Sequence, residues 1–391
     1  MKEKIIKLFL LFALFSGCCQ NQQNPGELIQ PTRIIVDNQA SGFTLSDVVD
    51  TIQFIVLETN KNSLLALAHK IVMTDSVIFF MDKRMTKKIV AFDHTGRFIN
   101  TIGNLGKGPG EYVDPESFCI THDNKIAVTD FASKKIVFYD QKGNLIQEKQ
   151  TDFYPICIES LDSSLYITSN SPYDLIYKLN IEGQSHSINF FDDPQFRSYE
   201  TYLRMCQDGV YFMQSFDDTV YFIEKETIHP MIFLDYQGKN MSRSEYLNYP
   251  PNVFSGIKLR NMIPPGKRFN KYNYFDNGDQ ITYVFSESTL SDDKLFFVLH
   301  NKNSGRTILA DFDNSFDDLF KIMNLCGICG NWKEFFIMSI DSYLFLERYK
   351  IIKDFFGSKR PEYLSIIEKI EKSISPVSNP ILVLLSFKKD F

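Results

Sequence analysis

The sequence predicts an all-β fold, a six-bladed β-propeller, and three observations lead to it. Aromatic residues make up 14% of the 391 residues, with 36 Phe and 19 Tyr, and these residue types favour strands. A pattern, KKIVx[FY]DxxG, occurs at residues 87–96 and again at 134–143. An Asp turn followed by alternating apolar residues recurs along the chain, at intervals close to the length of one propeller blade.

The two copies of the repeat lie 47 residues apart, and each is typical of a strand that ends in a hairpin. Apolar and polar residues alternate up to a glycine, Gly96 in the first copy and Gly143 in the second. An Asp turn and a short β run precede each copy, at residues 75–82 and 123–130. Several short strands in a unit of about 40–50 residues are the signature of a propeller blade.

The Asp turns give the number of blades. Asp favours such turns because its side chain can accept a hydrogen bond from the backbone amide two residues on. The spacings between successive turns are 48, 39, 46, 84 and 49 residues, and we assign the excess in the interval of 84 to an insertion near residues 237–279. Two unrelated β domains are the alternative, which the near-exact repeat disfavours. The six turns begin at Asp75, Asp123, Asp162, Asp208, Asp292 and Asp341.

The two ends of the chain are expected to close the ring. A propeller that does not join its last blade to its first leaves exposed sheet edges. Asp341 leaves room for only two strands before residues 360–373, which have the apolar spacing and flanking prolines of a short C-terminal helix. We predict that strands at 51–58 and 381–387, one from each end of the chain, complete blade six.

The N-terminus has the features of an export signal. A basic start is followed by an apolar stretch of about ten residues, which is too short to span a bilayer. The small residues Ser16 and Gly17 then precede Cys18, as in the lipobox of bacterial lipoproteins, in which the Cys is acylated. We predict a signal peptide over 1–17, acylation of Cys18, a polar tether over 18–44 and the propeller over 45–391. Acylation at Cys19, or a plain secretory signal with an unmodified Cys pair, is the alternative.

These features predict the location of the protein and its partners. An acylated Cys18 would anchor the chain in the outer membrane of the cell envelope, so one partner is the membrane. The residues after Cys18 lack an acidic cluster, which favours the periplasmic leaflet but leaves the membrane face open. The formal net charge of −6 argues against a nucleic-acid partner, because phosphate binding needs a basic face.

A Gly-rich loop between the first two blades carries a family resemblance. Residues 102–112 read IGNLGKGPGEY, and Asn379-Pro380 precedes the apolar run at 381–387. Together with the lipobox and the repeat, these motifs resemble the six-bladed, NHL-like β-propeller lipoproteins of Bacteroidota over about residues 45–390. The resemblance implies the fold and the compartment, and it implies no biochemical activity because that family has no agreed one.

No complete catalytic constellation is found in the sequence. The loop at 103–110 lacks the strand–helix context of a P-loop, so we expect a tight crossing in which Glu111 caps backbone amides. Cys326 and Cys329 form a lone CxxC, for which a disulfide, unpaired thiols and a functional role all stay open. The six His residues show no metal-ligand spacing. We therefore predict no catalytic residue, no metal and no cofactor.

Three sets of residues are candidates for ligand binding. Four cations within residues 83–88 form either a solvated hairpin or a basic rim for an acidic ligand. Aromatic residues of the insertion form either a recognition face or its own core: Tyr246, Tyr249, Phe254, Phe269, Tyr272, Tyr274 and Phe275. The inner strand of each blade should precede its Asp turn, which places six residues near the channel: His69, Lys70, Glu116, Glu159, Tyr202 and Arg204.

Two classes of function follow from these features. The first is a non-catalytic binding or scaffold module for a protein or glycan ligand, favoured because no catalytic constellation is present and a large insertion is. The alternative is a metal-assisted hydrolase or lyase with its site at the mouth of the propeller channel.

Overall fold

The chain divides into two units, Met1–Gln30 and Pro31–Phe391, and every described strand and helix belongs to the second. The predicted signal peptide and Cys18 lie outside the described residues. None of the helices in the described ranges is long and apolar enough to cross a membrane. This computed structural model describes residues 30–36, 45–169, 176–180, 185–188, 201–206, 209–214, 217–224, 227–241, 245, 263–289, 294–311, 318–323 and 327–391.

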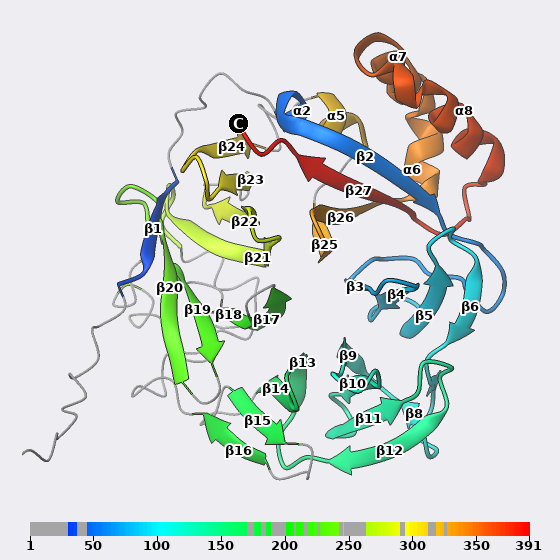
Figure 1. Cartoon of the computed structure of the whole chain (residues 1–391), viewed down its shortest axis with the longest axis vertical. Helices are drawn as coiled ribbons and strands as arrows, with labels where there is room; N and C mark the ends of the chain where they lie inside the picture. Colours follow the sequence, from blue (N-terminus) through cyan, green and yellow to red (C-terminus); the bar gives the residue numbers. More distant parts are fainter. Residues whose placement is uncertain are drawn as a thin grey trace, which may run out of the picture. The chain divides into compact units, whose positions relative to one another are not determined.

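Six sheets formed by the described residues are the blades of a β-propeller (Figure 1). Blade one consists of β3 (Lys70–Met73), β4 (Val77–Asp82), β5 (Lys88–Asp93) and β6 (Phe98–Thr101). Blade two consists of β9 (Pro115–Ile120), β10 (Ile126–Asp130), β11 (Lys135–Tyr139) and β12 (Leu145–Gln150). Blade three consists of β13 (Pro155–Leu161), β14 (Ser164–Ser169), β15 (Ile176–Asn180) and β16 (Ser185–Ile188).

The other three blades complete the ring, and two of them include a strand from the N-terminal part of the chain. Blade four consists of β17 (Thr201–Cys206), β18 (Gly209–Gln214), β19 (Thr219–Glu224), β20 (Thr227–Asp235) and β1 (Thr32–Ile35). Blade five consists of β21 (Arg268–Asp276), β22 (Gln280–Glu287), β23 (Lys294–Asn301) and β24 (Thr307–Asp311). Blade six consists of β25 (Ile328–Trp332), β26 (Phe335–Ile340), β27 (Ile381–Phe387) and β2 (Val49–Val56).

The first strand of each blade lies innermost. The six inner strands are β3, β9, β13, β17, β21 and β25, and each contacts the next around the ring. The last of them, β25, also contacts β3, so the ring is closed (Figure 1). The predicted all-β, six-bladed propeller is therefore confirmed.

Blades pack face to face, which explains why their central strands are apolar on both sides. Successive side chains of a strand point to opposite faces of the sheet. In β4, Ile78 and Phe80 join the hydrophobic cluster between blades six and one, whereas Phe79 and Met81 join the cluster between blades one and two. All four side chains are buried, so one strand contributes to two cores.

The glycine of the repeat packs blades one and two against the blades that precede them in the ring. Gly96 and Gly143 have positive φ angles of 85° and 82°, which favour glycine. A Cβ on Gly96 would lie 2.1 Å from the backbone oxygen of Val56 on β2, and a Cβ on Gly143 would lie 2.2 Å from the oxygen of Thr101 on β6. The glycine of the repeat is therefore required by its turn and by the outermost strand of the preceding blade.

Blade six is closed by both ends of the chain. Strand β2 pairs antiparallel with β27, and β27 pairs antiparallel with β26, so the sheet order is β2-β27-β26-β25. The residues predicted for these two strands, 51–58 and 381–387, match β2 and β27 closely. The prediction that each terminus supplies one strand is confirmed.

Asn379, in the motif before the last strand, ties the two ends together. Its side-chain amide donates to the backbone oxygens of Glu58 (2.8 Å) and Ser63 (2.9 Å) and accepts from the amide of Leu65 (2.8 Å). Its own backbone amide donates to Thr59 Oγ1 at 2.8 Å. Since Asn379 is fully buried, these bonds satisfy the backbone of the segment that links β2 to blade one.

The N-terminal segment expected to be a tether, 18–44, contains one strand. Strand β1 (Thr32–Ile35) pairs in parallel with β20 and becomes the outermost strand of blade four. Arg33 Nε donates to Asp235 Oδ2 at 2.7 Å, and Ile34 is buried in the core between blades four and five. A strand of the propeller therefore lies before residue 45.

The C-terminal helix is confirmed, but it belongs to a larger helical segment between β26 and β27. Residues 360–373 form the 3-10 turn η1 (Pro361–Tyr363) and α8 (Leu364–Ser373). Two helices that were not predicted precede it, α6 (Ser342–Glu347) and α7 (Tyr349–Lys359), and short helices α2 (Leu45–Val48) and α5 (Asp318–Met323) lie elsewhere.

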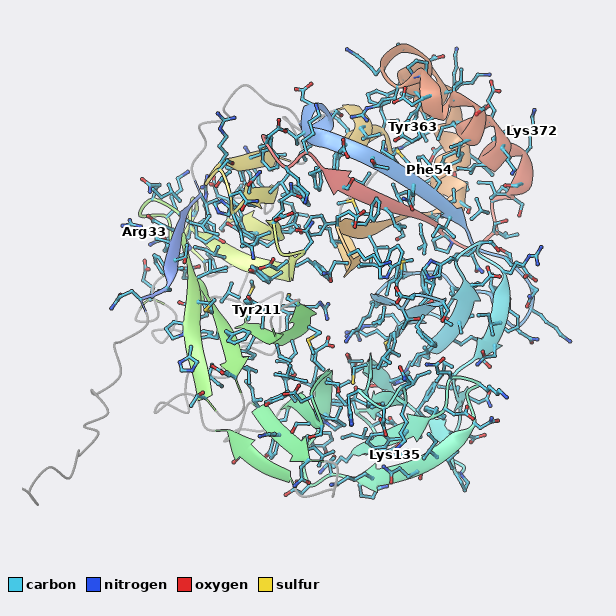
Figure 2. The ribbon with its side chains drawn as sticks, in the orientation of Figure 1. Arg33, Phe54, Lys135, Tyr211, Tyr363 and Lys372 are labelled. Carbon is cyan, nitrogen blue, oxygen red and sulfur yellow. The ribbon has the colours of Figure 1, made fainter. Side chains whose placement is uncertain are left out.

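The helices cover the outer strand of blade six. Figure 2 shows Tyr363 and Phe54 where the helices meet β2. The Tyr363 hydroxyl accepts a hydrogen bond from the Ile52 amide at 3.0 Å, and the rings of Phe54 and Phe356 have centroids 6.1 Å apart. A backbone donor of this edge strand is therefore satisfied by a helical side chain.

Two of the six Asp turns were assigned to the wrong place in a blade. Asp341 was expected to start a strand, but it is the N-cap of α6, because its carboxylate accepts hydrogen bonds from the amides of Tyr343 and Leu344. The first hairpin of blade six lies instead at Lys333, which has a positive φ angle of 53°. Asp292 lies outside the described residues, between β22 and β23. It does not follow the inner strand of blade five, whose first turn is made by Asn277.

The insertion is shorter than the predicted 237–279. Residues 268–276 form β21, the inner strand of blade five, so they belong to the ring. Tyr274 and Phe275 are each 2% exposed and lie in the cores on either side of that blade, which excludes them from a recognition face. Phe269 and Tyr272 are also part of β21 and not of an insertion. Tyr246, Tyr249 and Phe254 lie outside the described residues.

Replacing Asn379 should destabilise the ring strongly. Asn379→Ala leaves two buried carbonyls and one amide without partners, so we expect the free energy of unfolding to fall by at least about 3 kcal/mol. Urea unfolding of the variant measures this as a lower midpoint with an unchanged slope. Asn62→Ala, in the same segment but exposed, is the matched control; equal losses for the two variants would contradict the role of Asn379.

Candidate functional site

The candidate site is the centre of the ring, where the inner strands meet. Lys70 on β3 and Glu159 on β13 were both predicted to lie there, and the structure brings them together. Lys70 Nζ lies 2.6 Å from Glu159 Oε1, 3.2 Å from the backbone oxygen of Ile158 and 3.3 Å from Ser117 Oγ. The ion pair therefore joins blade one to blade three across the inner strand of blade two.

Both members of this pair are buried. Lys70 is 7% exposed and Glu159 is 5% exposed. Removing two charges from water is costly unless each is paired and fully hydrogen-bonded. The three acceptors around the Lys70 ammonium match its three N–H donors, so the charge is compensated inside the protein.

Glu116, also predicted as a site residue, pairs with the cationic turn of blade one. Lys83 Nζ lies 2.5 Å from Glu116 Oε2, and Lys87 Nζ lies 2.6 Å from Asp114 Oδ1. Two of the four cations at 83–88 therefore bind carboxylates of blade two. This hairpin is not an uninterrupted basic rim, because half of its charge links neighbouring blades.

His69 acts as an acceptor next to this turn. Its Nδ1 accepts a hydrogen bond from the Lys83 amide at 3.3 Å and lies 3.7 Å from Asp82 Oδ1. Burial lowers the pKa of His69, and this outweighs the opposite effect of the Asp82 carboxylate. The imidazole is therefore neutral at neutral pH, which its acceptor role requires.

Tyr202 and Arg204 lie on β17 of blade four, and both are partly buried. The Arg204 guanidinium lies 5.2 Å from the centroid of the Phe275 ring on β21, and its Nη1 donates to the backbone oxygen of Leu203 at 3.1 Å. Arg204 thus contacts blade five, whereas Lys70 and Glu159 join blades one and three. Of the predicted residues, Lys70 and Glu159 contact each other, whereas Glu116 pairs with Lys83 and Arg204 contacts Phe275.

The structure adds two aspartates whose role was not predicted. Asp82 and Asp130 end the second strands of blades one and two, and both are fully buried. Asp130 accepts hydrogen bonds from the amides of Val113 (3.0 Å) and Asp114 (2.9 Å), which lead into β9. In the sequence, an Asp is the last residue of each β run, at 75–82 and 123–130. The role of each Asp could not be predicted because it depends on contacts between segments that are distant in sequence.

Asp82 makes the same kind of contact in blade one. Its carboxylate accepts hydrogen bonds from the amides of Ala66 (3.0 Å) and Met85 (3.0 Å). Burial alone would raise the pKa of Asp82, but these backbone donors outweigh it and hold the pKa below its usual value. The ionised carboxylate therefore fixes the entry to β3 and the turn after β4.

A second polar cluster lies at the opposite ends of the strands in blade five. Lys302 Nζ lies 2.8 Å from Asp276 Oδ2, and the Tyr274 hydroxyl donates to the same oxygen at 3.1 Å. Nearby, burial and then the Lys302 charge lower the pKa of His300 to about 4. His300 is neutral at neutral pH, and its Nδ1 contacts Thr307 Oγ1 at 3.0 Å.

The Gly-Pro-Gly-Glu loop is a structural crossing, as expected. Glu111 Oε2 accepts a hydrogen bond from the Gly108 amide at 2.7 Å, which confirms that Glu111 caps the loop backbone. A Cβ on Gly106 would lie 2.0 Å from the same carboxylate oxygen. The glycine and the glutamate of the motif are therefore complementary, since the carboxylate occupies the space that a side chain would need.

The CxxC motif is only half described. Cys329 is buried and its thiol donates to the backbone oxygen of Ala68 at 3.4 Å. Burial raises the pKa of this thiol to about 11, which disfavours a reactive thiolate. Cys326 lies outside the described residues, so the pairing of the two cysteines stays open.

No three His, Cys, Asp or Glu side chains gather at metal-binding geometry within the described ranges. The buried carboxylates at the centre of the ring lie against lysines or backbone amides, as in the Lys70–Glu159 pair and around Asp82. These ion pairs and hydrogen bonds can hold the blades in register, and the charged groups are paired within the protein.

The sequence matches one family model over most of its length. That family is described as a domain of unknown function (DUF4934), and the match covers residues 31–386. The chain belongs to this family. The matched segment starts at the second structural unit and includes β1, so the DUF4934 domain extends from the parallel strand of blade four to the last strand of blade six. No curated protein matches the sequence.

Two solved structures are similar to this DUF4934 chain to different degrees. A protein described as exported, from Bacteroides fragilis NCTC 9343, is 19% identical, has a TM-score of 0.75, and is matched over 92% of this chain and 100% of its own. A virginiamycin B lyase from Staphylococcus aureus is 12% identical, with a TM-score of 0.44 over 74% of this chain and 96% of its own. The first likeness supports the resemblance to Bacteroidota propellers at the level of fold.

Replacing one member of the Lys70–Glu159 pair should lower the free energy of unfolding more than replacing both members. Lys70→Met leaves Glu159 buried and unpaired, so we expect the free energy of unfolding to fall by about 3–5 kcal/mol. Lys70→Met combined with Glu159→Gln should recover part of that loss, because no unpaired charge remains. Denaturant unfolding of both single variants and the double variant measures the coupling. Lys353→Met, from the exposed pair with Glu368, is the control; a loss as small as in that control would contradict the structural role.

Proposed function

We propose that the chain is a cell-envelope lipoprotein whose propeller is a non-catalytic binding or scaffold module for a protein or glycan ligand. The observation that carries this proposal is the mutual pairing of the charges at the centre of the ring. Lys70 binds Glu159, Lys83 binds Glu116, and each pair joins different blades. These groups stabilise a ring that is fixed in shape.

Such pairing disfavours catalysis by these residues. A general acid or base needs an atom within reach of substrate and a pKa matched to its task. The Lys70 ammonium is surrounded by three protein acceptors, and the pKa of His69 is lowered away from neutral pH. A rigid ring that presents loops at its two faces is instead suited to recognition.

The alternative, a metal-assisted hydrolase or lyase, would need ligands gathered at one end of the ring. In the part of the chain that the structure describes, no observation favours it over a binding module. We expect neither a cofactor nor a nucleic-acid partner.

Lipid anchoring is supported by the sequence, and export is supported by the sequence and by one structural relative. The basic start, the apolar stretch and the small residues before Cys18 support a lipoprotein signal. The similarity to a protein described as exported supports a location outside the cytoplasm, and an acylated Cys18 would make the outer membrane the partner of the chain.

Acylation can be tested directly in the full-length precursor. Metabolic labelling with a fatty acid should label the wild-type protein and the Cys19→Ser variant, because Cys18 carries the acyl group in both. Cys18→Ser should lose the label and move from the membrane fraction to the soluble fraction. Label that follows Cys19 and not Cys18, or no label in any form, would refute this assignment.

The binding function predicts saturable binding without turnover. The mature protein should bind at least one member of a panel of glycans or envelope proteins, seen as a rise of its melting temperature with ligand concentration. The same preparation should leave glycans, lactones and peptides chemically unchanged over many hours, with and without added divalent cations. Turnover of any of these compounds that is lost when the protein is denatured by heat would contradict the proposal.

A further inference from the structure

A cavity of about 80 Å³ lies between blades two and three. Its apolar lining residues are Phe138, Leu165 and Leu179, all members of the core between these blades. Its polar lining residues include the turn between β9 and β10, Ser160, Ser163 and Ser164, and Lys149 on β12. The cavity therefore combines apolar side chains with serines and a lysine.

Lys149 is the unusual member of this lining. It lies opposite Ile136 in the β11–β12 ladder and therefore on the strand face that packs towards blade three. Less than 1 Å² of its Nζ is exposed, and the ammonium has no hydrogen-bond partner among the described residues. Burial also lowers the pKa of Lys149.

The Lys149 ammonium, which has no described partner, contrasts with the ammonium groups of two buried lysines. Lys70 and Lys135 are 7% and 6% exposed, and each lies within 2.8 Å of a glutamate oxygen. A buried charge costs stability unless it is paired. Lys149 is only partly buried as a residue, but its Nζ is inaccessible and has no carboxylate partner among the described residues.

The charges around the cavity indicate how many negative charges the ligand carries. Lys125 also lines the cavity, but its Nζ lies 2.7 Å from Asp123 Oδ2, so this pair is neutral as a whole. Lys149 is therefore the lysine of the lining whose charge no described carboxylate balances. A second negative charge on the ligand would meet no free cation within the lining and would lie near the Asp123 carboxylate.

We propose that this cavity between blades two and three is a binding site for a carboxylate on a small molecule with an apolar face, such as an acidic sugar. The carboxylate pairs with the Lys149 ammonium, the serine hydroxyls bind polar groups of the ligand, and Phe138, Leu165 and Leu179 contact its apolar face. This inference rests on the proposed binding function and names the chemistry of one ligand.

The test measures binding of defined probes to the mature chain by calorimetry. Sodium D-glucuronate and sodium acetate are the probes, D-glucose is the neutral control, and inorganic phosphate tests a dianion. We expect saturable binding of a carboxylate and none of glucose. Lys149→Met should weaken carboxylate binding at least about tenfold, because a charge-assisted hydrogen bond is lost. Lys142→Met, an exposed lysine of the neighbouring β11–β12 turn, is the matched control and should bind as the wild type does.

A second measurement needs no ligand. Lys149→Met replaces an unpaired buried ammonium by an apolar group of similar length, so the ligand-free variant should melt at a higher temperature than the wild type. An equal or lower melting temperature would show that the ammonium is compensated, and would overturn the inference.

The remaining outcomes are equally decisive. Binding of neither carboxylate, equal affinity in Lys149→Met, or tighter binding of phosphate than of carboxylates would each overturn the site. Failure of the site is distinguishable from failure of the proposed function. Ligand binding that ignores Lys149 removes the site and leaves the binding function, whereas catalytic turnover removes the binding function even if Lys149 holds a carboxylate.

Discussion

The pairing of β2 with β27 is the constraint on which the rest of the structure depends. Each blade buries both faces against its neighbours, so a ring with one incomplete blade would expose two cores. The chain completes blade six with a strand from each of its ends, and Asn379 satisfies the backbone of the segment that follows β2. The helices α6 to α8 then cover the outer strand, so this last blade is protected on its free edge as well (Figure 2).

Hydrophobic clusters lie between the blades, and charged residues add specific contacts that link one blade to another. Lys70 reaches from blade one to Glu159 on blade three, and the turn after β4 reaches blade two through Lys83 and Lys87. Apolar packing is non-directional, whereas a buried ion pair or an Asp that accepts several amides fixes position. Lys149 departs from this pattern because it lines a cavity and its ammonium has no described partner, which is the contrast behind the proposed carboxylate site.

Much of the fold could be predicted because it repeats. The pattern ends at Gly96 and Gly143, whose turns have positive φ angles. The same two glycines pack blades one and two against the preceding blades. The Asp turns were less reliable, since an Asp before an apolar run can start a hairpin, as at Asp162, or cap a helix, as at Asp341. Asp162 has a positive φ angle of 51° in its hairpin, whereas the Asp341 carboxylate accepts two amide hydrogen bonds. Asp favours both positions, so the local sequence does not separate them.

The sequence by itself determined the number of blades, the strands that close the ring and the loop that Glu111 caps, because these depend on local periodicity and turn chemistry. Only the tertiary structure decided which charges meet. Lys70 and Glu159 are 89 residues apart, and Asn379 and Glu58 are 321 apart, so no local pattern links them. It also decided that β21 belongs to the ring and that β1 joins blade four, since strand pairing between distant segments is selected by packing. The cavity at Lys149 also depends on tertiary packing, because its lining residues come from both blade two and blade three.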